Sequence, residues 1–191
     1  MTRPLILGFA GRARAGKDSA AAAICTHCLD AGTTAGIYSI SQIILDDCIK
    51  RGLIPRKQRG ELNADELAVL VREGTAARKV DLQVWLFKIQ KAIYHDNFEV
   101  ALIPNVRFQR EADFIHKRGG YIVKVLRLNQ NGSTYISPDR DPNDVLETDL
   151  TFAPADFYLT ANTGDQELVA LQAVALYDYL IWREASRAML G

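Results

Sequence analysis

A glycine-rich segment near the start of the chain has the residue types and spacing of a phosphate-binding loop. It reads Gly11-Arg-Ala-Arg-Ala-Gly16-Lys17-Asp18, so four residues separate the two glycines and a lysine follows the second. Glycines let the backbone curve until its N–H groups converge on a phosphate, and the lysine adds a mobile cation. A buried strand before the loop and a helix after it would complete the site. The loop therefore predicts binding of a nucleoside triphosphate, with Lys17 bridging the transferring and leaving phosphates.

The residue after Lys17 is the irregular part of this loop. Asp18 stands where phosphate loops commonly have Ser or Thr, so we expect this carboxylate to hold Mg²⁺ directly or through a water. The hydroxyl of Ser19 is an alternative ligand. A glycine-rich turn with a chance lysine is the competing interpretation, and the predicted strand and helix argue against it. The candidate nucleotide-binding residues of the loop are Gly11, Arg12, Ala13, Arg14, Ala15, Gly16, Lys17, Asp18 and Ser19.

Apolar patterns along the chain predict the elements that must position the loop. Five segments read as strands, at residues 4–9, 36–41, 100–104, 121–127 and 157–160. Helical patterns cover residues 18–31, 42–51, 63–71, 81–97, 110–117 and 166–184, with Gly74–Thr75 as a candidate interruption. Such alternation predicts an α/β fold, a three-layer sandwich around a five-stranded parallel sheet. The polar segment 129–144 is expected to be a mobile excursion.

Bulk composition limits the classes of partner. The chain has 191 residues, 48% hydrophobic and 24% charged, which is ordinary for one globular domain. Lys+Arg and Asp+Glu are balanced at 23 each, so we expect neither stable nucleic-acid binding nor membrane binding. The first apolar run is too short to span a bilayer, and three cysteines are an odd number. A soluble protein in a reducing cytoplasm is the expectation.

Two other motifs could bind metal, and their context argues against both. Cys25-Thr-His27-Cys28 has Cys-x-x-Cys spacing but lies in the helix predicted after the loop, without a second pair to complete a zinc site. Core packing is the simpler interpretation. The segment 139–144 is rich in Asp but lacks the glycine and final glutamate of a calcium loop.

Beyond the loop, several segments are similar in order and spacing to one kinase family. Gly16-Lys17-Asp18-Ser19 resembles the Gly-Lys-Asp-Thr of phage deoxynucleoside monophosphate kinases. Further matching segments are Gly74-Thr75 with Arg78 and Trp85, Pro104-Asn105-Val-Arg107-Phe108 with Glu111, Arg127 at the end of the fourth strand, and Glu147 followed by Asp156 and Asn162.

The resemblance implies a nucleoside monophosphate kinase-like P-loop fold, an ATP donor, Mg²⁺ and a small-molecule deoxynucleotide acceptor. It also implies one kinase domain over residues 1–191, with acceptor-binding helices at about 41–97 and a lid at about 129–148. If the chain is phage-encoded, its location would be the host cytoplasm. A homodimer is a further expectation.

Planar guanidinium groups suit the two phosphates that such a kinase must align. By resemblance, Arg78 and Arg107 would hold the acceptor phosphate, while Arg127 and Arg140 would close over the donor near Asn162. Lys17, Arg107 and Arg127 are the candidate catalytic residues. A solvated surface charge is the alternative for any one arginine, above all for Arg140.

The sequence leaves open the role of Glu111 and the side chain on which the acceptor base would stack. Glu111 could orient Arg107, accept a sugar hydroxyl, or form a surface salt bridge. An acceptor base could stack on Phe108, Trp85 or Phe87, and Phe108 is favoured because it adjoins Arg107; core packing is the alternative for an aromatic at helical spacing.

The chain departs from the family at two positions. Asn105 replaces the usual aspartate, so it cannot serve as a carboxylate ligand or general base, although it can still position substrate. Leu45 stands near the place of a usual lysine, and the nearest basic residue is Lys50.

Three other functions are compatible with the same phosphate-binding loop. The acceptor could be a modified base in phage DNA, although the neutral charge disfavours a large DNA surface. Dephospho-coenzyme A kinase is a fold relative whose loop normally ends Gly-Lys-Ser/Thr, so Asp18 disfavours it. A nucleotide-binding module without catalysis is the remaining alternative.

Overall fold

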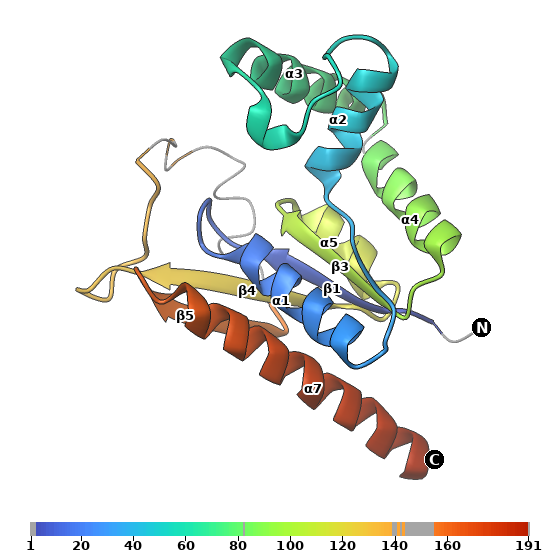
Figure 1. The fold of residues 1–191 in the computed structure, drawn as a ribbon, viewed down its shortest axis with the longest axis vertical. Coiled ribbons are helices and arrows are strands. Elements are labelled where there is room, and N and C mark those ends of the chain that lie inside the picture. Colours follow the sequence, from blue (N-terminus) through green and yellow to red (C-terminus); the bar gives the residue numbers. More distant parts are fainter. Residues whose placement is uncertain (1–2, 82, 139–140, 142, 144–154, 191) are drawn as a thin grey trace. The chain divides into compact units, whose positions relative to one another are not determined.

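The structure is a computed structural model that describes residues 3–81, 83–138, 141, 143 and 155–190 (Figure 1). The chain divides into two compact units, Met1–Ile37 with Glu99–Gly191 (unit 1) and Tyr38–Phe98 (unit 2).

Unit 1 is built on a five-stranded sheet in which all strands run parallel, as predicted. The strands are β1 (Leu5–Ala10), β2 (Ala35–Ile37), β3 (Val100–Val106), β4 (Tyr121–Leu128) and β5 (Phe157–Asn162), in the order β2-β3-β1-β4-β5. Because β1 lies between β3 and β4, the loop that follows it lies where the strand order reverses. Ligands of open α/β sheets bind at that place.

Helices cover both faces of this sheet and complete three layers. On one face lie α1 (Lys17–Asp30) and α7 (Gln166–Leu190), side by side, and α5 (Gln109–His116) covers the other (Figure 1). Leu7 and Phe9 of β1 are fully buried, as a central parallel strand requires. The sheet side chains and the inner faces of α1 and α7 form one core that fixes the start of α1 over the sheet.

Unit 2 is helical and has its own core. It contains α2 (Ile40–Lys50), the 3₁₀ turn η1 (Arg59–Glu61), α3 (Ala64–Val80) and α4 (Val84–Asp96). A capping box starts α3, because the side chain of Asn63 accepts from the N–H of Glu66 and the carboxylate of Glu66 accepts from the N–H of Asn63, both at 2.9 Å.

Two predictions about element boundaries were wrong. The second strand is only Ala35–Ile37, and helix α2 starts at Ile40, because the extended Ser39 is its N-cap and turns the chain into a helix. Nor does Gly74 interrupt α3. A Cβ at Gly74 would lie 3.0 Å from Cδ1 of Ile44, so the glycine lets α2 and α3 approach closely without breaking the helix.

Candidate active site

Backbone geometry explains the glycines of the loop between β1 and α1. Gly11 has φ 137°, Arg14 has φ 59° and Gly16 has φ 104°, so three loop residues adopt conformations that L side chains rarely accept. A Cβ at Gly11 would lie 2.3 Å from the carbonyl oxygen of Val125. The loop can therefore curve beside β4 only with glycine at position 11.

Lys17 starts α1, and its side chain returns over the loop. Its Nζ donates to the carbonyl oxygen of Arg12 at 2.7 Å, and the residue is 3% exposed. A phosphate in the loop would offer this ammonium charged oxygens, which are stronger acceptors than a carbonyl. The N-terminal amides and dipole of α1, which begins after Gly16, would favour the same anion.

A bulge at the end of β3 aims Asn105 at this loop. Phe9 lies opposite Pro104 and Ala10 opposite Val106, so Asn105 has no partner on β1. Its φ is 70°, a left-handed value that asparagine tolerates better than most residues. The Nδ2 of Asn105 donates to Oδ1 of Asp18 at 3.2 Å. Two candidate residues that lie 87 positions apart in the chain are thus in direct contact.

The residues after the carboxyl end of β1 offer ligands that suit Mg²⁺. Asp18 is an exposed carboxylate in the first turn of α1, and the exposed Ser19 follows it. Mg²⁺ in phosphotransferases typically takes one or two carboxylates and completes its shell with water and phosphate. Among the residues that the structure describes, no group of three His, Cys, Asp or Glu side chains could hold a metal. Bound nucleotide would have to complete the shell.

Arg127, at the end of β4, reaches across the loop. Its Nη1 donates to the carbonyl oxygen of Arg14 at 3.2 Å, and its Nε donates to the hydroxyl of Thr163 at 3.2 Å. The guanidinium lies 3.9 Å from the ring centre of Tyr135. Backbone, hydroxyl and aromatic contacts therefore hold this cation over the loop before any ligand binds.

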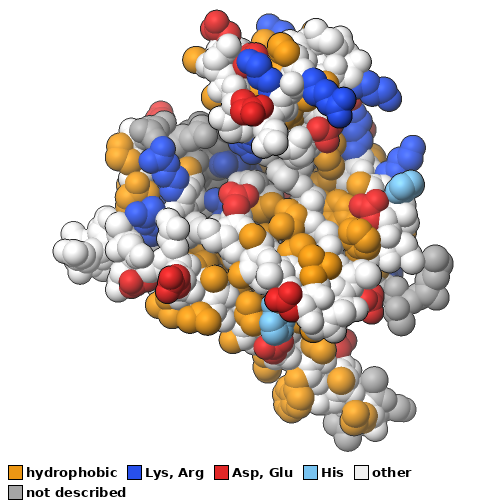
Figure 2. Space-filling view, viewed as in Figure 1, with side chains coloured by type: hydrophobic (Ala, Val, Ile, Leu, Met, Phe, Trp, Pro, Cys, Tyr) orange, Lys and Arg blue, Asp and Glu red, His pale blue; other side chains and the backbone are white. Residues whose placement is uncertain are grey.

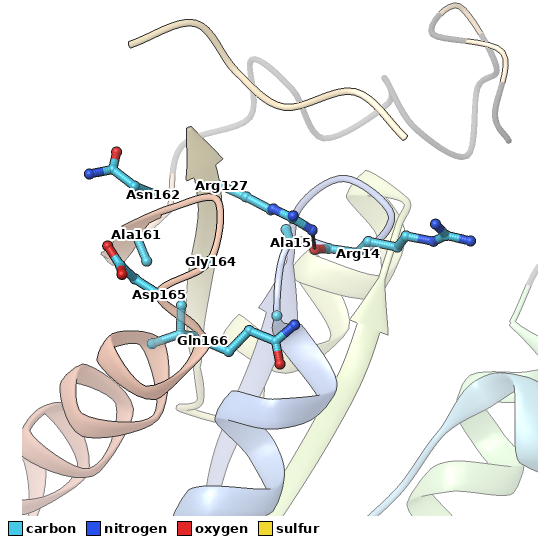
Figure 3. A pocket seen from close by; sticks show the side chains of 10 residues that line it. Arg14, Ala15, Arg127, Ala161, Asn162, Gly164, Asp165 and Gln166 are labelled. Atoms are coloured by element: carbon cyan, nitrogen blue, oxygen red, sulfur yellow. Dashed lines mark hydrogen bonds between the residues drawn. The ribbon is translucent and has the colours of Figure 1, made fainter. Parts of the chain in front are cut away.

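An open hollow lies beside Arg127, between the loop and the turn after β5 (Figure 3). Its lining combines a few small apolar side chains with several charged and polar ones. The lining residues are Arg14, Ala15, Gly16, Arg127, Ala161, Asn162, Gly164, Asp165, Gln166 and Val169. Sequence reasoning named Asn162 but missed Gly164, Asp165 and Gln166, although a Gly-Asp turn between a strand and a helix would have indicated them.

The start of the predicted lid is a tight turn in the described structure. The N–H of Asn129 donates to Ser133 and the N–H of Tyr135 donates to Arg127, each at 2.8 Å to a carbonyl oxygen. This turn brings the ring of Tyr135 under Arg127. Arg140 and Glu147 lie outside the described residues, as do most positions of the predicted lid beyond 138.

Glu111 organises the chain after β3 from a buried position. It is 3% exposed, and its Oε2 accepts from the N–H of Arg107 at 2.8 Å and of Phe108 at 3.2 Å. It therefore fixes the backbone that carries Arg107. The half-buried ring of Phe108 has the guanidinium of Arg110 4.8 Å from its centre.

The other predicted acceptor residues belong to unit 2. Trp85 is 4% exposed, its Nε1 donates to the carbonyl oxygen of Gly74 at 3.1 Å, and Lys88 lies over its ring. These contacts are those of a core residue, which was the alternative considered for it. Arg78 lies in the last turn of α3, and Leu45 is fully buried in the core. Phe87 is exposed on α4.

The cysteines behave as packing residues in this structure. Cys28 and Cys48 are buried, while Cys25 is half-buried and its Sγ lies 3.8 Å from the carbonyl oxygen of Ala35. Burial raises the pKa of the Cys28 thiol, so it is a poor nucleophile and metal ligand.

Comparison of whole structures gives the fold. A provisionally assigned kinase from Chloroflexus aurantiacus superposes with a TM-score of 0.52 at 13% identity, covering 94% of this chain and 97% of that one. The likeness establishes the fold. It is a three-layer α/β sandwich with an all-parallel sheet, shared with a kinase-like protein.

Other similarities are weaker. The APS kinase of Mycobacterium tuberculosis gives TM-scores of 0.47 at 15% identity, in a complex with AMPPNP and APS, and 0.46 at 14% identity as a mutant. These cover 94% and 93% of this chain and 99% of each kinase chain. No protein-family model and no curated protein sequence matches the chain. No helix among the described residues is long and apolar enough to cross a membrane.

Proposed function

We propose that this protein is a Mg²⁺-dependent kinase that transfers the terminal phosphoryl group of ATP to a deoxynucleoside monophosphate. The proposal rests on three groups that converge at the carboxyl ends of the strands. A buried lysine lies over a phosphate loop, a carboxylate follows it in the chain, and an arginine crosses the loop from β4. Phosphoryl transfer needs this kind of charge stabilisation more than it needs covalent chemistry.

The donor would lie along the loop, with its base in the hollow beside Arg127. The ammonium of Lys17 would leave the carbonyl of Arg12 for phosphate oxygens, and Arg127 would neutralise charge that develops between donor and acceptor. Asp18, oriented by Asn105, would hold Mg²⁺, with Ser19 as the neighbouring hydroxyl. The bound metal would offset negative charge on the phosphates.

Asn105 favours a phosphate as the acceptor over a hydroxyl. A hydroxyl must lose a proton during transfer, whereas a phosphate is already ionised and needs no base. The amide of Asn105 cannot take a proton. Glu111 is a poor candidate for a base, because its carboxylate already accepts hydrogen bonds from two backbone N–H groups. Arg107, on the backbone that Glu111 fixes, would bind the acceptor phosphate.

We propose that residues 1–191 form one kinase domain. Arg78, within residues 41–97, is our candidate for the acceptor phosphate, and Phe108 is our candidate for stacking on the acceptor base. A lid at about 129–148 that carries Arg140 stays a prediction, because most of that segment beyond 138 lies outside the described residues. Closure of such a lid excludes water and so limits wasteful hydrolysis of ATP.

A coupled assay of ADP release tests the proposal, with common and modified deoxynucleoside monophosphates as acceptors. We expect turnover that needs both Mg²⁺ and one of these acceptors. ATP binding by calorimetry without turnover on any acceptor would instead identify a nucleotide-binding module. Turnover only with DNA that carries a modified base would identify the polymer as the substrate. If the protein shows neither ATP binding nor turnover, all three functions are excluded.

A further inference from the structure

Helix α7 has two apolar faces, and only one of them is covered by the residues of unit 1 that the structure describes. The inner face contributes Val169, Ala173, Tyr177 and Leu180 to the core, all of them buried. The outer face carries Leu168, Leu171, Ala175, Tyr179 and Trp182. These outer positions recur at intervals of three and four residues, so they form one stripe along the helix.

The outer stripe is unusually exposed for its residue types. Leu171 is 69% exposed and Trp182 is 65% exposed, with Tyr179 at 46% and Leu168 at 41%. Figure 2 shows apolar side chains along the lower part of the molecule, where α7 lies. Contiguous apolar patches that contain large aromatic residues mark interaction surfaces more often than bare solvent-facing surface.

The stripe is symmetric about its centre. Leu171 and Tyr179 each lie four residues from Ala175, and Leu168 and Trp182 each lie seven residues from it. If two α7 helices cross antiparallel with a two-fold axis at Ala175, each leucine of one copy meets an aromatic residue of the other. The small alanine lets the two backbones approach at the axis.

Charges at the ends of α7 favour the same antiparallel arrangement. Asp165 and Glu167 lie at its N-terminal end, while Arg183 and Arg187 lie near its C-terminal end and flank Glu184. An antiparallel pair brings the acidic end of one helix beside the more basic end of the other. It also opposes the two helix dipoles, whereas a parallel pair would align like charges.

The two aromatic side chains of the stripe already pack against other rings. Tyr179 packs edge-on against Phe157, with ring centres 6.4 Å apart, and lies 6.3 Å from Trp182. Preordered aromatic side chains lose little conformational entropy on association.

Edge strand β5 of the sheet is capped at Thr160 by a side chain of α7. The side chain of Gln172 accepts from the N–H of Thr160 at 2.9 Å and donates to its carbonyl oxygen at 3.0 Å. Both backbone groups of this residue on edge strand β5 are therefore occupied. A second copy that paired with β5 would have to displace Gln172, which disfavours association through that edge strand.

We propose that the outer face of α7 is a self-association surface, at which two copies of this chain pack antiparallel about a two-fold axis at Ala175. The inference is independent of the catalytic proposal, because the stripe lies outside the candidate active site.

Sedimentation velocity of the whole protein tests this inference. We expect a dimer with about twice the 21.2 kDa mass of the chain. Ala175→Glu places two like charges at the axis and should weaken association by roughly thirtyfold or more. The control is Leu29→Glu on α1, where the side chain is 59% exposed and lies outside the stripe. It should leave the dimer intact, and circular dichroism should show both variants folded.

A cysteine at the axis tests the geometry directly. Ala175→Cys should form a covalent dimer under mild oxidation, because each new thiol faces its own copy, whereas Leu29→Cys should not. A wild-type protein that stays monomeric overturns the inference. So does a dimer that survives Ala175→Glu, or an Ala175→Cys variant that cross-links no faster than its control.

Discussion

At the scale of single residues, Lys17 and Asn105 decide what the phosphate loop can do. One is a buried ammonium bonded to the backbone of its own loop, and the other is a left-handed residue at a bulge. Each occupies a position that folding alone would not favour. Such positions are more common at functional sites than in ordinary packing.

Lys17→Ala should abolish the proposed activity without unfolding the chain. It removes the cation that would bind the transferring and leaving phosphates, so we expect kcat to fall by roughly a hundredfold or more. Coupled ADP release measures the effect. Lys117→Ala, at an exposed position of unit 1, is the matched control and should retain activity. Full activity of Lys17→Ala would refute the phosphate-loop interpretation.

Asn105 should act through both its amide and its backbone, and two variants separate the effects. Asn105→Gly removes the hydrogen bond to Asp18 but accepts φ 70°, so stability should be nearly unchanged while Mg²⁺-dependent turnover falls roughly tenfold. Asn105→Ala should lose the same activity and about 1 kcal/mol of stability as well. Urea unfolding and Mg²⁺ titrations of turnover measure the two effects. Equal stability of the two variants would show that the bulge is not strained.

At the scale of elements, a charged cluster links the three helices of unit 2. Lys88 of α4 and Arg51, the C-cap of α2, both donate to Asp47 of α2, and Arg51 also donates to Glu73 of α3 at 2.8 Å. The hydrogen bond from Lys88 lowers the pKa of Asp47 in the folded chain. Ionisation of Asp47 therefore favours the folded state.

Asp47→Asn should destabilise the protein by about 1 kcal/mol at neutral pH. Because the folded pKa is lowered, the contribution of Asp47 is fully present above the unfolded value of about 3.9. It is lost as the pH falls through the lower folded value. The difference in unfolding free energy between wild type and variant should therefore shrink below about pH 4. Asp46→Asn is the control, because Asp46 is exposed and accepts a hydrogen bond from the neutral side chain of Gln42 in the same helix. A pH-independent difference would contradict this account.

At the scale of the whole molecule, the nucleotide should stabilise the fold that forms its site. The loop, Arg127 and the turn after β5 come from distant parts of the chain, so ligand binding would link them. A non-hydrolysable ATP analogue at about 100 times its Kd should add about 2.7 kcal/mol. For a chain of this size, that corresponds to a rise in Tm of roughly 5–11 °C.

Differential scanning calorimetry with and without Mg²⁺ measures this shift. Lys17→Ala should show little of it, whereas Lys117→Ala should show all of it. A shift that is equal in wild type and Lys17→Ala would place the nucleotide elsewhere on the molecule.

Local sequence determined the loop and the sheet. The glycine spacing from Gly11 to Gly16 and the five apolar segments depend on backbone preferences and burial, which neighbouring residues largely encode. The all-parallel sheet was therefore predicted correctly. The strand boundary at Ile37 and the continuity of α3 through Gly74 were not, because a cap and a close helix contact override local pattern there.

Tertiary structure decided which side chains meet. The contact of Asn105 with Asp18 depends on a one-residue shift in the pairing of β1 with β3, which neither strand's sequence displays. The contacts of Arg127 with Thr163 and Tyr135 depend on where two separate loops return to the end of β4. Local preferences are set by neighbours in the chain, whereas such contacts are set by packing and register between segments far apart, so they emerge only in the folded molecule.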